Sequence, residues 1–171
     1  MYAPVRLSGQ GLVLREWSDA DLPAMVELFD EPEIARRSPL ASPFDLAAAT
    51  AYLNMIRRTR AAGERLHLAI TTDGQRPLGE VLLNLSRGSM GYAVGAAYRG
   101  QHLAVRAVQI MTDCAHEDLG LERVVLQIEP HNGPSIAVAE AAGFRPATDE
   151  PEQVEGKGRC YTLLTWEHHK P

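Results

Sequence analysis

Apolar residues recur with two different periods along the chain, and the changes of period divide it into expected helices and strands. Residues 12–17 are expected to form a strand. Ser18 then precedes a carboxylate three residues later, close to a capping box, and the apolar stripe over residues 22–29 has helical spacing. A second helix, with Pro at its first position, is expected over residues 42–62. The polar, proline-punctuated residues 31–41 are expected to be a loop or a short helical turn.

The middle of the chain changes to strand-like patterning. Residues 66–72 and 78–86 are apolar runs joined by a DGQRP turn, and residues 92–95 follow a second turn that contains glycine. Three consecutive strands with such short connections are expected to form an antiparallel meander.

The second half of the chain alternates helix and strand. A helix with one apolar face is expected up to about residue 120, a β-branched interior strand over residues 123–129, and an Ala-rich helix over residues 132–142. A last strand over residues 160–166 should precede a frayed polar tail of residues 167–171. The two helices would begin at neighbouring strand ends, where anionic cofactors tend to bind.

Composition excludes several classes of protein. The chain of 171 residues is 45% hydrophobic and 23% charged, which is typical of one globular α/β domain spanning residues 1–171. Subtracting 22 acidic from 17 basic residues gives a net charge of -5, which disfavours nonspecific binding of nucleic acid. No apolar stretch approaches the roughly 20 residues of a membrane helix, and the N-terminus lacks a signal-peptide pattern. We therefore expect a cytoplasmic protein with neither nucleic acid nor membrane as a partner.

The cysteine content argues against a disulfide framework and against a zinc site. Cys114 and Cys160 are far apart, and neither has Cys or His at metal-ligand spacing. Both are expected to be buried thiols, and no metal is expected.

An Arg-Gly turn between a strand and a helix is the strongest candidate for a binding site. The backbone N–H groups of residues 100–104 would lack partners at the start of that helix and would point at one spot, as a pyrophosphate site requires. The alternative is an ordinary strand-to-helix turn that uses glycine for tight geometry.

The same turn carries a resemblance to a known family. The sequence RGQHLA over residues 99–104 is similar to the [Q/R]-x-x-G-x-[G/A] signature of the GNAT superfamily of N-acetyltransferases, with His102 where the family has Gly. Asn132, Ser135 and the Gly-Phe pair at 143–144 resemble a later segment of that family. The opening of the chain, LGEVLLN and GYAV further resemble its RimJ/RimL-type branch, the ribosomal-protein alanine N-acetyltransferases. The resemblance implies a mixed, mostly antiparallel sheet of about seven strands flanked by about four helices.

The resemblance also implies a binding site for acetyl-CoA as acyl donor, with helix-terminal N–H groups and no metal holding the phosphates. The pyrophosphate would lie on the loop, and the pantetheine arm would pair with the strand and contact the later asparagine. The cofactor-binding residues implied are Tyr92, Ala93, Val94, Arg99, Gly100, Gln101, His102, Leu103, Ala104, Asn132 and Ser135.

Proton transfer requires an acid for the leaving sulfur and a base for the attacking amine. Ser135 is the expected acid, the alternative being a neutral first-turn residue; Asn132 could likewise be only a helix cap. The family's tyrosine four residues later is absent, because Ala139 stands there. Glu80 is the expected base because it interrupts an apolar strand, the alternative being a solvent-facing or edge carboxylate. His131 is a second candidate base.

The expected function is acetyl transfer to a primary amine by direct attack on the thioester. The acceptor is expected to be an N-terminal α-amine or a small amine, bound by residues 31–42, by the start of the second helix and by the acidic residues 149–155. A catalytically weak domain that binds acyl-CoA as a sensor or interaction module is the alternative, and a homodimer is left open. A flavodoxin-like nucleotide-binding protein is disfavoured, because the first strand is not followed by a glycine-rich phosphate loop.

Overall fold

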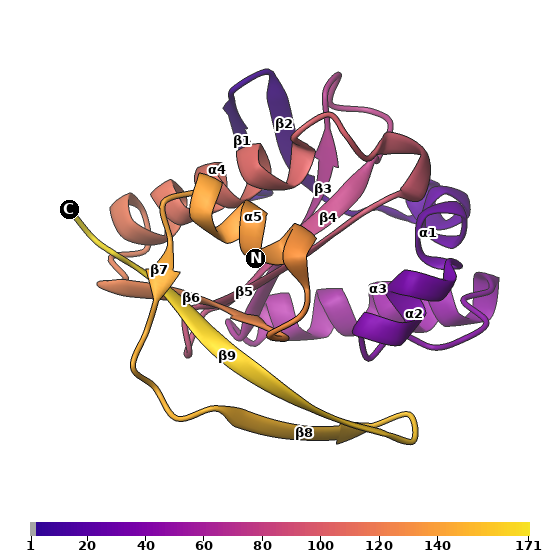
Figure 1. Ribbon diagram of the computed structural model, residues 1–171. Helices are drawn as coiled ribbons and strands as arrows, with labels where there is room; N and C mark the ends of the chain where they lie inside the picture. The colour runs from indigo at the N-terminus through magenta and orange to yellow at the C-terminus, as the bar shows by residue number, and fades with distance from the viewer. Residues whose placement is uncertain (1–2) are drawn as a thin grey trace.

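Nine strands form the sheet of the computed structural model, which describes residues 3–171 (Figure 1). Eight of them follow the spatial order β1-β2-β3-β4-β5-β6-β9-β7, and β8 pairs with β9 alone. The strands are β1 (Arg6–Gly9), β2 (Leu12–Glu16), β3 (Arg65–Thr71), β4 (Gly79–Asn84), β5 (Ser89–Val94), β6 (Arg123–Ile128), β7 (Arg145–Pro146), β8 (Glu152–Gly156) and β9 (Arg159–His169). All pairings are antiparallel except that of β5 with β6, so the mixed, mostly antiparallel α/β sheet and the β3-β4-β5 meander are confirmed.

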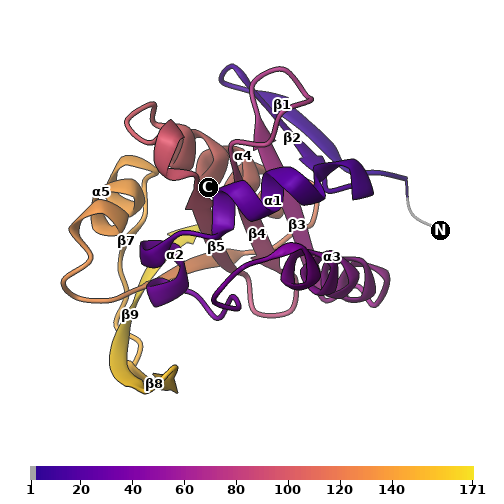
Figure 2. The same cartoon turned by 90° about the vertical axis from the view of Figure 1, so that its right-hand side faces the viewer.

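Helices cover both faces of this sheet. They are α1 (Leu22–Phe29), α2 (Pro32–Arg37), α3 (Leu46–Ala61), α4 (Leu103–Glu117) and α5 (Gly133–Ala141). In Figure 1, α4 and α5 lie above the central strands and α2 and α3 below them, and Figure 2 shows α1 crossing one face of the strands. The residues on the two faces form separate cores. One core joins α4 and α5 to the sheet, and the other joins α1 and α3 to it and contains the aromatic rings of Trp17, Phe29 and Phe44.

One helix cap agrees with the sequence-based expectation and another differs from it. The expected capping box forms between Ser18 and Asp21 at the short 3-10 turn before α1. Helix α3, however, begins at Leu46 and not at Ser42, because the Asp45 side chain accepts the Ala48 N–H at 2.9 Å and is the cap. The preceding Phe44 is buried in the aromatic core, which holds residues 42–44 outside the helix.

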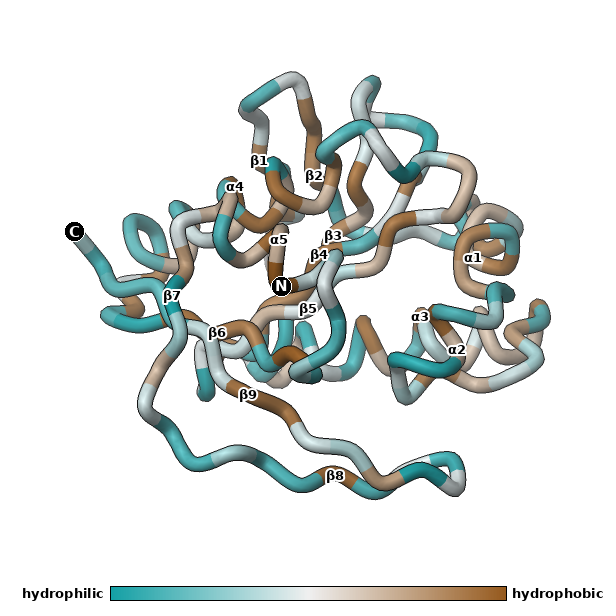
Figure 3. Tube along the Cα trace, viewed as in Figure 1, coloured by the Kyte–Doolittle hydropathy of each residue, from teal (hydrophilic) through white to brown (hydrophobic). Residues whose placement is uncertain are grey.

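The C-terminal third differs most from the sequence-based expectation. The expected acidic loop contains the edge strand β8, which pairs with β9. Its residues are mostly polar, so the sequence pattern did not predict a strand there (Figure 3). The expected frayed tail is wrong for residues 167–169, which continue β9. Glu167 pairs with Arg123 at 2.8 Å, and the half-buried His168 ring packs on Phe144, so these polar residues have specific tertiary partners. Together with β1, β8 brings the sheet to more strands than expected.

The two cysteines lie in different environments. Cys114 is buried in α4 as expected, and burial raises the pKa of its thiol to about 11. Cys160 is exposed on β9, so the expectation of a second buried thiol is wrong. Within residues 3–171, no helix is long and apolar enough to cross a lipid bilayer.

Candidate active site

The two parallel strands at the centre of the sheet separate along their length. β5 and β6 pair at only two positions, Ser89 with Val125 and Met90 with Leu126. Beyond Met90, β5 remains paired with β4 on its other side, so the backbone of residues 91–94 faces an opening and not a neighbouring strand. A cavity of about 710 Å³ occupies this opening, a volume typical of small-molecule sites.

Nearly all the expected cofactor-binding residues meet at this cavity. It is lined from β5, from the loop before α4, and from the start of α5 by Tyr92, Ala93, Val94, Arg99, Gly100, His102, Leu103, Ala104, Asn132 and Ser135. Gln101 does not line it. A further part of the wall comes from α2, from the two residues after it and from β9, through Glu33, Ile34, Arg37, Ser38, Pro39, Tyr161 and Leu163. The expected acidic wall from residues 149–155 and the start of α3 lie outside it.

The loop before α4 offers unpaired donors to this cavity. The backbone N–H groups of residues 99–105 make no backbone hydrogen bond within residues 3–171, and the first N–H that does is that of Arg106, to the His102 carbonyl at 3.2 Å. The loop turns through two left-handed residues, Gly100 with φ 85° and His102 with φ 57°. His102 therefore occupies the backbone conformation that favours glycine, the residue at its place in the family signature.

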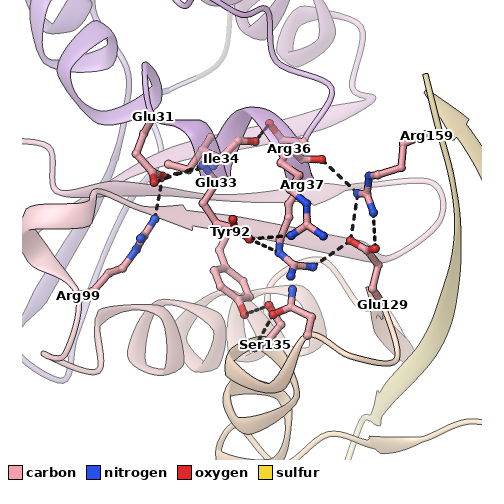
Figure 4. A network of polar contacts seen from close by, with 12 residues as sticks. Glu31, Glu33, Ile34, Arg36, Arg37, Tyr92, Arg99, Glu129, Ser135 and Arg159 are labelled. Carbon is pink, nitrogen blue, oxygen red and sulfur yellow. Dashed lines mark hydrogen bonds and ion pairs between the residues drawn. The ribbon is translucent and has the colours of Figure 1, made fainter. Parts of the chain in front are cut away.

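Ser135 lies at the start of α5, where two polar groups contact it. Its backbone N–H donates to the Asn132 side chain at 3.4 Å, so Asn132 caps α5. Its hydroxyl oxygen accepts a hydrogen bond at 2.9 Å from Tyr92, which extends from β5 (Figure 4). Burial raises the pKa of Tyr92, so its phenol stays protonated at neutral pH. The sequence analysis expected only the backbone of Tyr92 in the site. Side chains alternate between the two faces of a strand, and this alternation along β5 is the signal that could have predicted that the Tyr92 ring points toward α4 and α5.

Ion pairs occur at the cavity wall, where Glu33, Arg37 and Glu129 line it (Figure 4). Glu129 accepts hydrogen bonds from Arg37 at 3.0 Å and from Arg159 at 2.6 Å, and the Arg159 hydrogen bond is the main cause that lowers the Glu129 pKa. The pKa of Glu33 is lowered chiefly by its hydrogen bond with Arg37. Both carboxylates that line the cavity are thus weak bases.

Glu80 lies on β4, outside the residues that line the cavity. It is 3% exposed, so the alternative of a solvent-facing carboxylate is wrong. One carboxylate oxygen accepts from the Tyr52 hydroxyl and lies 3.4 Å from Nδ1 of the buried His67. Its other oxygen accepts no hydrogen bond from residues 3–171. The second candidate base, His131, is exposed in the turn before α5 and also lies outside the cavity lining.

Two parallel strands separate, and a helix begins at the opening between them, which defines an α/β cofactor-binding fold. The loop before that helix carries an acyltransferase-like motif. The chain belongs to the GNAT acetyltransferase domain family, whose model matches residues 11–145. It is 24% identical over 154 residues, 86% of each chain, to a Bacillus licheniformis protein named uncharacterized N-acetyltransferase p20.

Solved structures share the fold. A GNAT-family acetyltransferase from Bacillus anthracis superposes with a TM-score of 0.82 at 14% identity, covering 97% of this chain and 99% of that one. Mycobacterium smegmatis RimJ, solved in complex with CoA-disulfide, gives 0.77 at 20% identity, covering 97% and 86%. RimJ-type proteins are therefore among the structural neighbours of this chain.

Proposed function

We propose that this protein transfers the acetyl group of acetyl-CoA to a primary amine, by direct attack of the amine on the thioester. The observation that supports this most strongly is the continuity of one cavity from the unpaired N–H groups before α4 to the hydroxyl of Ser135. The N–H groups and the dipole of α4 suit a pyrophosphate. The edge of residues 91–94 that faces away from β4 suits the amide groups of a pantetheine arm, which would direct the thioester toward Ser135.

In this proposal, Ser135 donates a proton to the departing sulfur of CoA. The amine nitrogen attacks the thioester carbonyl carbon, the carbon–sulfur bond breaks, and the sulfur takes its proton from the Ser135 hydroxyl. Because this contact matters only as charge develops on sulfur, Ser135→Ala should lower kcat more than it raises KM for acetyl-CoA. The expected loss in kcat is on the order of tenfold to a hundredfold. Unchanged kcat would reduce Ser135 to a helix-start residue.

The proposed acceptor is an N-terminal α-amine of a peptide or protein. An α-amine titrates near pH 7.7 to 8.0 and a lysine side chain near 10.4, so an enzyme with weak bases uses the former more readily at neutral pH. Glu33 and Glu129, the carboxylates of the cavity wall, are both paired with arginine, which supports this preference. Peptides with free α-amines should outperform lysine peptides with blocked N-termini and small polyamines. A clear preference for either of the latter would reject the α-amine and leave acetyl transfer intact.

Glu80 remains the proposed base, acting through a water molecule because it does not line the cavity. Its unpartnered oxygen and its position beside Ala93, its cross-strand partner that does line the cavity, support this role.

Titration calorimetry with acetyl-CoA, joined to a thiol-release assay over an amine panel, tests the function as a whole. Binding with turnover is the expected result. Binding without turnover would favour the alternative of an acyl-CoA sensor or interaction module. His102 in place of the motif glycine and the position of Glu80 outside the cavity lining are the observations that support this alternative. No binding would reject both.

A further inference from the structure

Tyr92 and Ser135 form the one hydrogen-bonded pair of hydroxyl groups among the described residues that line the cavity. The Tyr92 phenol donates to the Ser135 oxygen at 2.9 Å, and it makes no other hydrogen bond within residues 3–171. The tyrosine belongs to β5 and the serine to α5, so the pair spans the opening between the separated strands (Figure 4). The ring of Tyr92 packs against the apolar core under α4, which fixes the direction of its hydroxyl.

A serine hydroxyl acting alone is a poor proton donor to a thiolate. Giving up its proton would leave an alkoxide, which is far more basic than the sulfur that it protonates. A phenol hydrogen-bonded to that oxygen changes this balance, because a phenol, even with its pKa raised by burial, is a far stronger acid than an aliphatic alcohol. The second hydroxyl can replace the proton in the same step.

We propose that Tyr92 supplies the proton that Ser135 gives to the leaving sulfur. This inference rests on the proposed acetyl transfer. As the carbon–sulfur bond breaks, the Ser135 O–H bond breaks and an S–H bond forms, while the Tyr92 O–H bond breaks and the Ser135 O–H bond forms again. The phenolate of Tyr92 then regains a proton from solvent, to which Glu80 releases the proton that it takes, through water, from the attacking amine. Tyr92 acts through Ser135 and need not touch the substrate.

Burial of Tyr92 is consistent with this role. Desolvation raises the pKa of the phenol, so Tyr92 holds its proton across the neutral range and is available as a donor before the reaction begins.

A double-mutant cycle of Tyr92→Phe and Ser135→Ala tests the proposal. Each single variant should lower kcat on the order of tenfold with little change in KM for acetyl-CoA, and the double variant should lose no more than the worse single one, because the two hydroxyls act as a unit. Tyr161→Phe is the matched control, since it removes from the same cavity a phenol that makes no hydrogen bond within residues 3–171. Its effect measures the general cost of losing a cavity hydroxyl, which Tyr92→Phe must exceed.

A second measurement separates proton supply from a structural role. Replacing Tyr92 with 3-fluorotyrosine keeps its shape and hydrogen bond but makes the phenol more acidic. The alkaline limb of the kcat profile should therefore move to lower pH, and a structural hydroxyl would leave that limb in place. Additive losses in the cycle, or an unmoved limb, overturn the role of Tyr92 while acetyl transfer stands. A wild-type protein that acetylates no amine overturns both proposals.

Discussion

Arg99 of the proposed cofactor loop donates a hydrogen bond to Glu31 at 2.9 Å, and the same carboxylate caps α2 by accepting from the N–H of Ile34 at 3.2 Å. The ion pair therefore ties the loop to a helix that forms part of the cavity wall. In the proposed complex, the pyrophosphate and Glu31 would compete for Arg99.

Glu31→Gln should tighten CoA binding by up to about fivefold, because an exposed ion pair that must be broken costs about 0.2–1 kcal/mol. The glutamine oxygen can still accept one of the two N–H groups that the Glu31 carboxylate accepts, those of Glu33 and Ile34, so the helix should keep part of its cap. Glu117→Gln, on the exposed end of α4, removes the same charge far along that helix and should leave the affinity unchanged. Calorimetry at low and high salt measures the difference; equal affinities for the two variants would show that Glu31 does not compete.

His102→Gly should stabilise the fold and keep or improve CoA affinity. The left-handed backbone of His102 costs a side-chain-bearing residue about 1–2 kcal/mol, which glycine avoids, while glycine loses about 0.5–1 kcal/mol through the freedom of the unfolded chain. The net gain in unfolding free energy is roughly 0.5–1 kcal/mol, measurable by urea denaturation. A strong loss of affinity in the folded variant would show that the His102 side chain itself contacts the cofactor.

Glu80→Gln should lower kcat about a hundredfold if Glu80 is the base, because removal of a general base costs at least that much. The amide oxygen still accepts the Tyr52 hydroxyl, so the buried cluster should keep its fold. Tyr52→Phe removes that hydrogen bond and leaves the carboxylate in place, and it should reduce kcat much less. Comparison of both variants by steady-state kinetics and thermal unfolding decides the role. A folded Glu80→Gln variant with wild-type turnover would contradict it.

The stability of the protein should fall as the pH drops below about 6.5, the ordinary pKa of histidine. Burial lowers the pKa of His168 in the folded state, and His116, whose Nε2 lies 3.0 Å from His168 Nδ1, adds to the shift. The unfolded chain therefore binds the proton first, and each step in pH between the two pKa values removes stability until the folded form is also protonated.

Thermal unfolding between pH 5 and 8 measures this effect, and His168→Gln should flatten the profile. The glutamine amide can still donate to His116, whose Nδ1 lies 2.7 Å from the Leu121 carbonyl and therefore carries its proton there. An equally steep profile in the variant would assign the acid sensitivity to other groups.

The sequence alone determined the features that depend on near neighbours. Helical and strand periods gave the order of most elements, and single side chains predicted the caps of the 3-10 turn before α1 and of α5. The turn at residues 99–104 indicated both the helix N-terminus and the family. These signals are local, because each is written within a few consecutive residues. Two expectations failed because they relied on local patterns alone. The helix expected from Ser42 begins later because residues 42–44 are held by the aromatic core, and the loop expected at residues 152–156 is a strand because it pairs with β9.

The tertiary structure alone decided how distant segments meet. The separation of β5 from β6, the approach of α2 to the cavity and the hydrogen bond from Tyr92 to Ser135, 43 positions apart, depend on the packing of several elements at once. The packing also leaves Glu80 outside the cavity lining and pairs the half-buried His168 with the buried His116, although both residues were visible in the sequence. Residue type and period give the direction of a side chain within its own element, but only the packed fold determines what that side chain contacts.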